Sequence, residues 1–158
     1  AGHAVQRVGV PVAGRNRPET ADVAGVVINT VVMQARVEPR MPLSALLAQV
    51  HATALEAREH EDLPFEHGAQ VLRPERGAQG SGLFQCMFNH LGEGGRPLQG
   101  WPGLAVRRVD PGLRAAPFGL TLETMEDAGG HVLAAFRYDA TRFTPQAMAD
   151  IAGHYGRM

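Results

Sequence analysis

The segment from residue 25 to residue 37 constrains the fold more than any other part of this chain. It reads GVVINTVVMQARV and is apolar on both faces until Gln34. β-Branched side chains favour strands, and a run that is apolar on both faces is typical of a strand buried in a sheet covered on both sides. We therefore predict a buried strand over residues 25–37.

Weaker patterns predict the elements around this strand. Apolar residues that alternate with others predict further strands at 4–13, 83–91, 104–109, 118–126 and 131–138, the last two as a hairpin around 127–130. Apolar residues spaced by three and four predict helices from Pro42 to about Glu59 and from Pro64 to Leu72, and Thr144 with Pro145 begins a third. Residues 14–22 form a predicted polar loop.

The helical patterns also predict which faces point inward. The expected inner stripe of the first helix is Leu43, Leu46, Leu47, Val50, Ala54 and Leu55, and that of the last helix is Met148, Ile151, Ala152 and Tyr155. Strands and helices alternate in the first half, and strands dominate the second. The predicted fold class is therefore α/β (α+β), a mixed β-sheet with helices packed on it, within a single domain over residues 1–158.

Composition excludes several classes of function. The 15 Lys and Arg nearly balance the 16 Asp and Glu in this 158-residue chain, which argues against nucleic acid or an anionic membrane as a partner. A single cysteine excludes a disulfide framework, and no apolar run is long enough to span a bilayer. We expect a cytoplasmic protein. Because the sequence lacks an initial Met and begins at once with a strand pattern, we also expect a piece of a longer chain.

The residues that most often carry chemistry do not form a self-sufficient active site. Cys86 lies in an apolar strand, where burial keeps a thiol protonated and inert, and the two serines are in no nucleophile motif. His60 and His67 flank a short acidic stretch, so a metal site there is conceivable, but their spacing matches no zinc motif and a solvated acidic turn is the simpler interpretation. We predict no catalytic and no metal-binding residue in this chain.

Four segments, in order, resemble the condensation domains of nonribosomal peptide synthetases. Residues 8–19 (VGVPVAGRNRPE) are similar to the family's G-x-P-x-A-G-R-x-x-P-E segment, and residues 25–30 (GVVINT) to G-x-F-V-N-T. Residues 60–66 (HEDLPFE) resemble H-Q-D-x-P-F-E, and residues 73–76 with 83–89 (RPER and LFQCMFN) resemble P-E-R followed by P-L-F-Q-V-M-F-N. The collinear order makes the resemblance specific, and it covers nearly the whole chain.

This resemblance implies the C-terminal lobe of a two-lobed fold like that of chloramphenicol acetyltransferase. Such domains transfer a carrier-bound acyl or peptidyl thioester to the amine of a carrier-bound aminoacyl group. The family's catalytic H-H-x-x-x-D-G motif is absent here, so the chain is expected to be inactive alone. The resemblance implies no bound cofactor; phosphopantetheine would arrive on partner carrier domains. The other implied partners are the N-terminal lobe and an adenylation domain.

The same resemblance implies that this lobe forms one wall of the tunnel between the lobes. Asn29 and Thr30 match the family's channel strand, and Arg15 matches its loop arginine. The carboxamide of Asn29 could orient a pantetheine amide or the attacking amine. Alternatively, Asn29 is satisfied by neighbouring backbone, and Arg15 serves a structural role.

Two departures from the family pattern keep alternatives open. The family's R-D-x-S-R-x-P-L-F is replaced by residues 76–84 (RGAQGSGLF), and its F-D-L by Phe118, Gly119 and Leu120. One alternative is a degenerate lobe that only docks carriers or neighbouring domains. Another is a relative of the superfamily that epimerises, cyclises or forms esters. In each case an uncovered lobe surface is expected to make the isolated chain self-associate.

Overall fold

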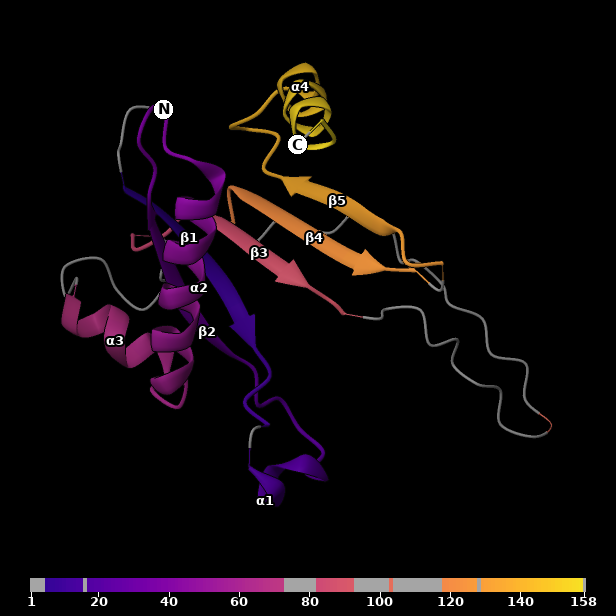
Figure 1. Cartoon of the computed structure of the whole chain (residues 1–158). Coiled ribbons are helices and arrows are strands. Elements are labelled where there is room, and N and C mark those ends of the chain that lie inside the picture. The colour runs from indigo at the N-terminus through magenta and orange to yellow at the C-terminus, as the bar shows by residue number, and fades with distance from the viewer. Residues whose placement is uncertain are drawn as a thin grey trace. The chain divides into compact units, whose positions relative to one another are not determined.

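The structure is a computed structural model, and it describes residues 5–15, 17–72, 82–92, 103, 118–127 and 129–157. The elements are β1 (Val5–Val12), α1 (Pro18–Ala21), β2 (Asn29–Arg36), α2 (Leu43–Glu59), α3 (Phe65–Leu72), β3 (Cys86–His90), β4 (Leu120–Glu126), β5 (Val132–Tyr138) and α4 (Pro145–Tyr155) (Figure 1). The chain divides into two compact units, Ala1–Phe88 and Asn89–Met158. The strand predicted at 104–109 and the family segment at 73–76 lie outside the described residues.

The strands form a mixed sheet, as the sequence predicted. β1 and β2 pair antiparallel from Val5 opposite Arg36 to Val12 opposite Asn29. β1 also pairs in parallel with β3, where Val8 lies opposite Cys86. The hydrogen-bonded order is β2-β1-β3-β4-β5, so β2 is an edge strand among the described residues. The predicted α/β class, with helices against a mixed sheet, is confirmed.

The strand predicted at 25–37 is shorter than expected, because β2 begins only at Asn29. Gly14 turns the chain with φ +62°, and a Cβ there would lie 2.0 Å from the Val27 carbonyl oxygen. This close approach folds the segment before β2 against the loop after β1. Val26 and Ile28 are consequently 93% and 66% exposed, so the apolar run does not enter the sheet until Asn29.

Helix α2 packs against β2, and the two lie beside each other in Figure 1. The Gln49 side chain accepts a hydrogen bond from the Arg36 amide and donates to the Arg36 carbonyl at 3.3 Å. The Thr53 hydroxyl donates to the Gln34 carbonyl at 3.2 Å. An edge strand has unpaired N–H and C=O groups, and these two side chains satisfy three of them, the amide and carbonyl of Arg36 and the carbonyl of Gln34.

This arrangement corrects the expected inner stripe of α2 and the expected burial of β2. Leu46 and Ala54 of the expected stripe are half-buried, as predicted, whereas Leu43, Leu47 and Leu55 are 69%, 59% and 52% exposed. The strand itself is half-buried rather than buried on both faces, with Gln34 exposed.

Two further elements differ in detail from the predictions. A four-residue helix, α1, replaces part of the loop predicted at 14–22, with Pro18 at its start and Glu19 in its first turn, both favourable there. In α4, Met148 is buried as predicted, but Tyr155 is 39% exposed and Ala152 is exposed. The predicted cap of α4 is confirmed, since Thr144 Oγ1 accepts from the Ala147 amide at 3.2 Å.

Each unit is built around few buried apolar side chains. In the first unit, Ala69 and Phe84 are buried, and the rings of Phe65 and Phe84 lie 5.6 Å apart. In the second, the predicted hairpin is confirmed, with β4 antiparallel to β5 from Leu120 opposite Tyr138 onward. Among the described residues, no helix has the length and hydropathy needed to cross a membrane.

Candidate functional site

The side chain of Asn29 ties the start of β2 to the turn between α2 and α3. Its Nδ2 donates to the carbonyl oxygens of Glu61 and Leu63, both at 2.7 Å, and its Oδ1 accepts from the Phe65 amide at 3.0 Å. Both amide protons are therefore used, as well as one acceptor position. The Asn29 side chain is thus bonded to the backbone of residues 61–65.

The turn that Asn29 holds has local reasons for its shape. Leu63 N donates to the His60 carbonyl at 3.1 Å, and the amides of His67 and Gly68 donate to the Pro64 carbonyl as α3 begins. Proline fixes φ at a value suited to a helix start. An ion pair between Arg17 and Asp62 links the same turn to the loop after β1.

Arg15 braces a different segment, the loop that carries α1. Its guanidinium donates to the carbonyl oxygens of Thr20 and Val23 at 2.7 Å and to that of Gly25 at 3.1 Å. The rigid fork of an arginine suits several acceptors at once. Arg15 therefore holds the backbone of residues 20–25, and Asn29 holds that of residues 61–65.

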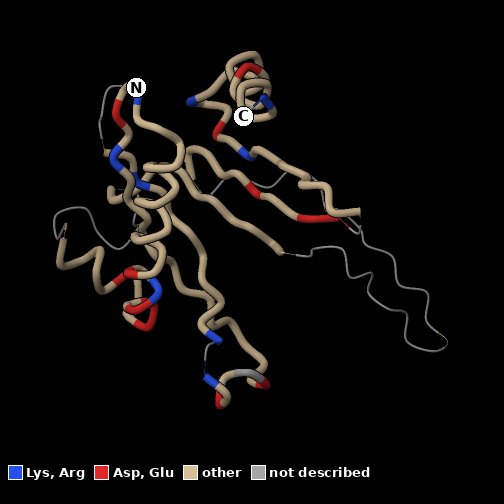
Figure 2. Tube along the Cα trace, viewed as in Figure 1, with Lys and Arg blue, Asp and Glu red and all other residues tan. Residues whose placement is uncertain are grey.

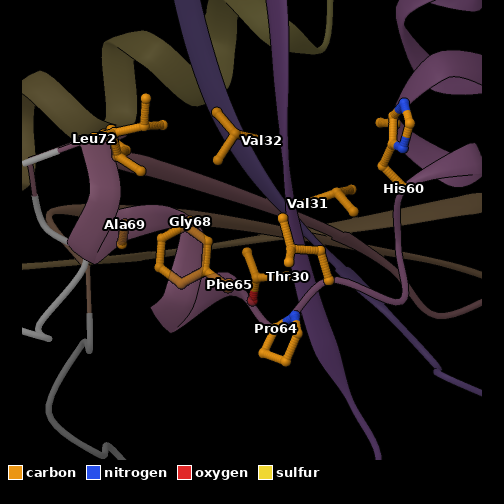
Figure 3. A pocket seen from close by; sticks show the side chains of 12 residues that line it. Thr30, Val31, Val32, His60, Pro64, Phe65, Gly68, Ala69 and Leu72 are labelled. Carbon is orange, nitrogen blue, oxygen red and sulfur yellow. The ribbon is translucent and has the colours of Figure 1, made fainter.

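Thr30, the third predicted site residue, lines a pocket of about 190 Å³. The walls come from β2, the end of α2, the turn, α3 and the segment before β3 (Figure 3). The lining residues are Thr30, Val31, Val32, Ala57, His60, Leu63, Pro64, Phe65, Gly68, Ala69, Leu72 and Leu83. Only Thr30 and His60 bring polar side-chain atoms, so the pocket is mostly apolar.

The chain around this pocket is acidic. Between residues 56 and 66 there are five carboxylates (Glu56, Glu59, Glu61, Asp62 and Glu66) and one cation, Arg58. Figure 2 shows these acidic residues grouped at the end of α2 and the start of α3. Asp62 pairs with Arg17, and Arg58 lies 4.0 Å from Glu61. Glu56, Glu59 and Glu66 are exposed and form no ion pair with the described residues.

The sequence patterns do not predict this pocket. They offer His60 as a possible metal ligand and place Phe65 and Leu72 in a predicted helix, but only the fold brings these residues beside Thr30. The sequence contains one weak sign of the pocket. The apolar face of residues 65–72 extends back into Leu63 and Pro64, which precede the helix.

The other reactive side chains are not among the residues that line the pocket. Burial raises the pKa of the Cys86 thiol above its ordinary value, as the sequence predicted for a thiol in an apolar strand. His90 is exposed, and its Nδ1 lies 2.9 Å from the Thr124 hydroxyl. In the part of the chain that the structure describes, no three His, Cys, Asp or Glu side chains form a group that could hold a metal.

Comparison with known proteins extends the sequence resemblance to the whole chain. The model of the condensation domain family matches residues 1–158. One of the linear gramicidin synthase proteins of Brevibacillus parabrevis is 38% identical over 161 residues, covering 96% of this chain and 2% of that protein. The chain thus corresponds to a small part of the curated relatives it matches.

Solved structures show the same fold. A four-domain nonribosomal peptide synthetase bound to AMP and glycine aligns with a TM-score of 0.73 and 18% identity, covering 94% of this chain and 12% of that one. The first condensation domain of the calcium-dependent antibiotic synthetase, in complex with a substrate analogue, aligns with a TM-score of 0.69 and 16% identity. There the alignment covers 99% of this chain and 33% of the other.

Proposed function

This chain belongs to the condensation domain family, and we propose that it is the C-terminal lobe of such a domain in a nonribosomal peptide synthetase. In this proposal it forms one wall of a tunnel in which a carrier-bound acyl thioester is transferred to the amine of a carrier-bound aminoacyl group. The observation that carries the proposal is the family match over residues 1–158, in a chain that spans about one third of a solved condensation domain.

The chemistry of amide formation assigns a limited part to this lobe. The amine nitrogen attacks the thioester carbonyl, the C–S bond breaks, and the thiol leaves while the amine loses a proton. A general base must accept that proton, and the adjacent histidine pair of the family motif is not in this sequence. We infer that the base lies in the other lobe and that this chain alone forms no amide.

The contribution proposed for this lobe is therefore orientation of the reacting groups. Thr30 is the proposed tunnel-lining side chain, since it matches the family's channel strand and is half-buried at the start of β2. Asn29 and Arg15 are proposed to shape the wall as positioning residues, because their donors already bind backbone carbonyls. Orientation of this kind lowers a barrier by holding reactants in a productive geometry.

The proposed partners follow from the same reaction. The N-terminal lobe supplies the base, carrier domains bring both substrates on phosphopantetheine arms, and an adenylation domain adjoins the lobe, all in the cytoplasm. The isolated chain is proposed to self-associate, because large apolar side chains such as Val26, Leu43 and Leu72 are exposed. Light scattering at increasing concentration tests this point, and a monomer at every concentration would contradict it.

The test of function uses the chain joined to its native upstream segment. Two loaded carrier domains are added, and the amide product is followed by mass spectrometry. We expect product from the joined protein and none from the chain alone. A folded, soluble joined protein that forms no product would overturn the proposal and favour a lobe that only docks its partners, whereas an ester, an epimer or a cyclic product would assign it to a different reaction of the superfamily.

A tunnel-wall role for Thr30 is tested within the same assay. Thr30→Val keeps the side-chain volume but removes the hydroxyl, and we expect a lower rate of product formation with unchanged stability. Gln70→Ala is the matched control, because Gln70 is exposed on α3 outside the pocket lining. Equal rates of product formation for Thr30→Val and the parent protein would contradict a role of the Thr30 hydroxyl in the tunnel wall.

A further inference from the structure

The pocket beside Thr30 has a mostly apolar lining, and part of that lining comes from an acidic segment, residues 56–66. We propose that the pocket is a docking site for one large apolar side chain presented by a basic segment of a partner protein. The site is defined by charge and shape, so this inference does not depend on acyl transfer in the tunnel.

The size of the pocket favours a side chain over a metabolite. Its volume is about 190 Å³, below the ~300–1,000 Å³ that is usual for small-molecule sites. This space equals the liquid volume of roughly six water molecules, which suits one leucine, methionine or phenylalanine side chain. Anchors of this kind, seated in a pocket, dominate the energetics of many protein interfaces.

The surface around the opening supports the same conclusion. Leu63 and Leu72 line the pocket, yet their side chains are 59% and 68% exposed. Val71, which precedes Leu72 in the sequence, is 82% exposed. A partner seated on the pocket would remove these side chains from water, which is favourable. The pocket itself is already formed, with Ala69 buried and the Phe65 amide held by Asn29.

The charges around the pocket select a basic partner. Glu56 and Glu59 flank the lining residues Ala57 and His60 in the sequence, and Glu66 follows the lining residue Phe65. Within the described residues these three carboxylates have no cationic partner. Lysine or arginine beside the apolar anchor would complement them, and charges at the rim mainly raise the association rate and the specificity.

Three short peptides separate the contributions of anchor and charge. The probes are Lys-Lys-Phe-Lys-Lys, Lys-Lys-Ala-Lys-Lys and Glu-Glu-Phe-Glu-Glu, each titrated into the ¹⁵N-labelled full chain and followed by amide chemical shifts. We expect the first probe to shift residues 57–72 in a saturable way and the other two to bind at least ~10-fold more weakly, as for loss of an interface anchor. Added salt should weaken the first interaction.

Variants of the chain then locate the binding. Ala69→Leu fills the pocket, and Leu72→Ser, at an exposed position that a folded chain tolerates, removes apolar contact; both should weaken the first probe. Glu59→Gln with Glu66→Gln should weaken it roughly two- to five-fold, the range for exposed charges, whereas Glu38→Gln, an exposed carboxylate outside the pocket lining, should not. Equal binding of the phenylalanine and alanine probes, shifts confined to other residues, or unchanged binding by Leu72→Ser would overturn the proposal.

Discussion

Asn29 Oδ1 accepts a hydrogen bond from the backbone amide of Phe65 at 3.0 Å, across 36 positions of sequence. Together with the two bonds from Asn29 Nδ2, it attaches the first residue of β2 to the first residue of α3. The pocket lies next to this attachment, since Thr30 and Phe65 are both part of its wall. The shape of the candidate site therefore depends on one carboxamide.

Replacement of Asn29 by alanine should destabilise the first unit. The change leaves two carbonyl oxygens and one amide without their partner, and buried or half-buried groups of this kind cost ~1–3 kcal/mol each when unsatisfied. Allowing for partial access of water, we expect the free energy of unfolding to fall by about 2–3 kcal/mol, measured by urea denaturation. The matched control Gln70→Ala removes an exposed amide with no hydrogen bond to the described residues. This control should change the free energy of unfolding by less than ~0.5 kcal/mol. A loss no larger than that of the control would contradict the bracing role.

Arg15→Lys should loosen the loop between β1 and β2. One ammonium cannot reproduce the fork that binds the carbonyls of Thr20, Val23 and Gly25. We expect several-fold faster cleavage by thermolysin before the apolar residues of 23–28, measured by mass spectrometry of timed digests. Arg7→Lys, which changes an exposed arginine bonded to Gln34, is the control. If both variants are cleaved at the parent rate, Arg15 does not hold this loop.

Two glycines should respond to alanine in opposite directions. A Cβ on Gly9 would lie 2.4 Å from the Phe84 ring, whereas one on Gly68 would meet no atom within 4 Å. Gly9→Ala should therefore lower the free energy of unfolding by about 1–3 kcal/mol, as overpacking does. Gly68→Ala should raise it by roughly 0.5–1 kcal/mol, because alanine restricts the unfolded chain and favours helix. Denaturant titrations check both, and a stabilising Gly9→Ala would be incompatible with this packing.

The carboxyl group of Asp139 should titrate below the ordinary value of 3.8. Hydrogen bonds from the Thr141 hydroxyl at 2.6 Å and the Thr141 amide at 2.9 Å lower its pKa, and Arg142 adds a smaller effect. Because the folded pKa is below the unfolded one, the stabilisation is complete above the unfolded pKa and is lost as the pH falls through the folded value. Carboxyl ¹³C NMR should show this, with a higher pKa in Thr141→Val and little change in Thr141→Ser. An unchanged pKa in Thr141→Val would exclude the hydroxyl as its cause.

The sequence predicted most of the fold because most elements rest on local patterns. Alternation at 118–126 and 131–138 indicated the hairpin, and Thr144 with Pro145 indicated the start of α4. The prediction from sequence was wrong where residues from another part of the chain contact the backbone of a predicted strand. Residues 25–28 have strand composition, but Arg15 takes the carbonyl of Gly25 and Gly14 lies against Val27, so the strand begins later.

The candidate site shows the same division between local pattern and tertiary contact. Family motifs identified Arg15, Asn29 and Thr30, but a motif does not specify the atoms that a side chain binds. The carboxamide of Asn29 meets residues 61–65, and Gln49 of α2 binds the backbone of β2, through contacts between chain segments 13–36 positions apart.

By itself, the sequence determined the family, the class of fold and the order of most elements, because short-range periodicity and collinear motifs carry that information. Only the tertiary structure decided where the apolar pocket lies, which leucines of α2 stay exposed, and which carboxylates of residues 56–66 form ion pairs with the described residues. The physical reason is that hydrogen bonds and burial depend on groups far apart along the chain, and these acquire fixed partners only when the strands and helices come together.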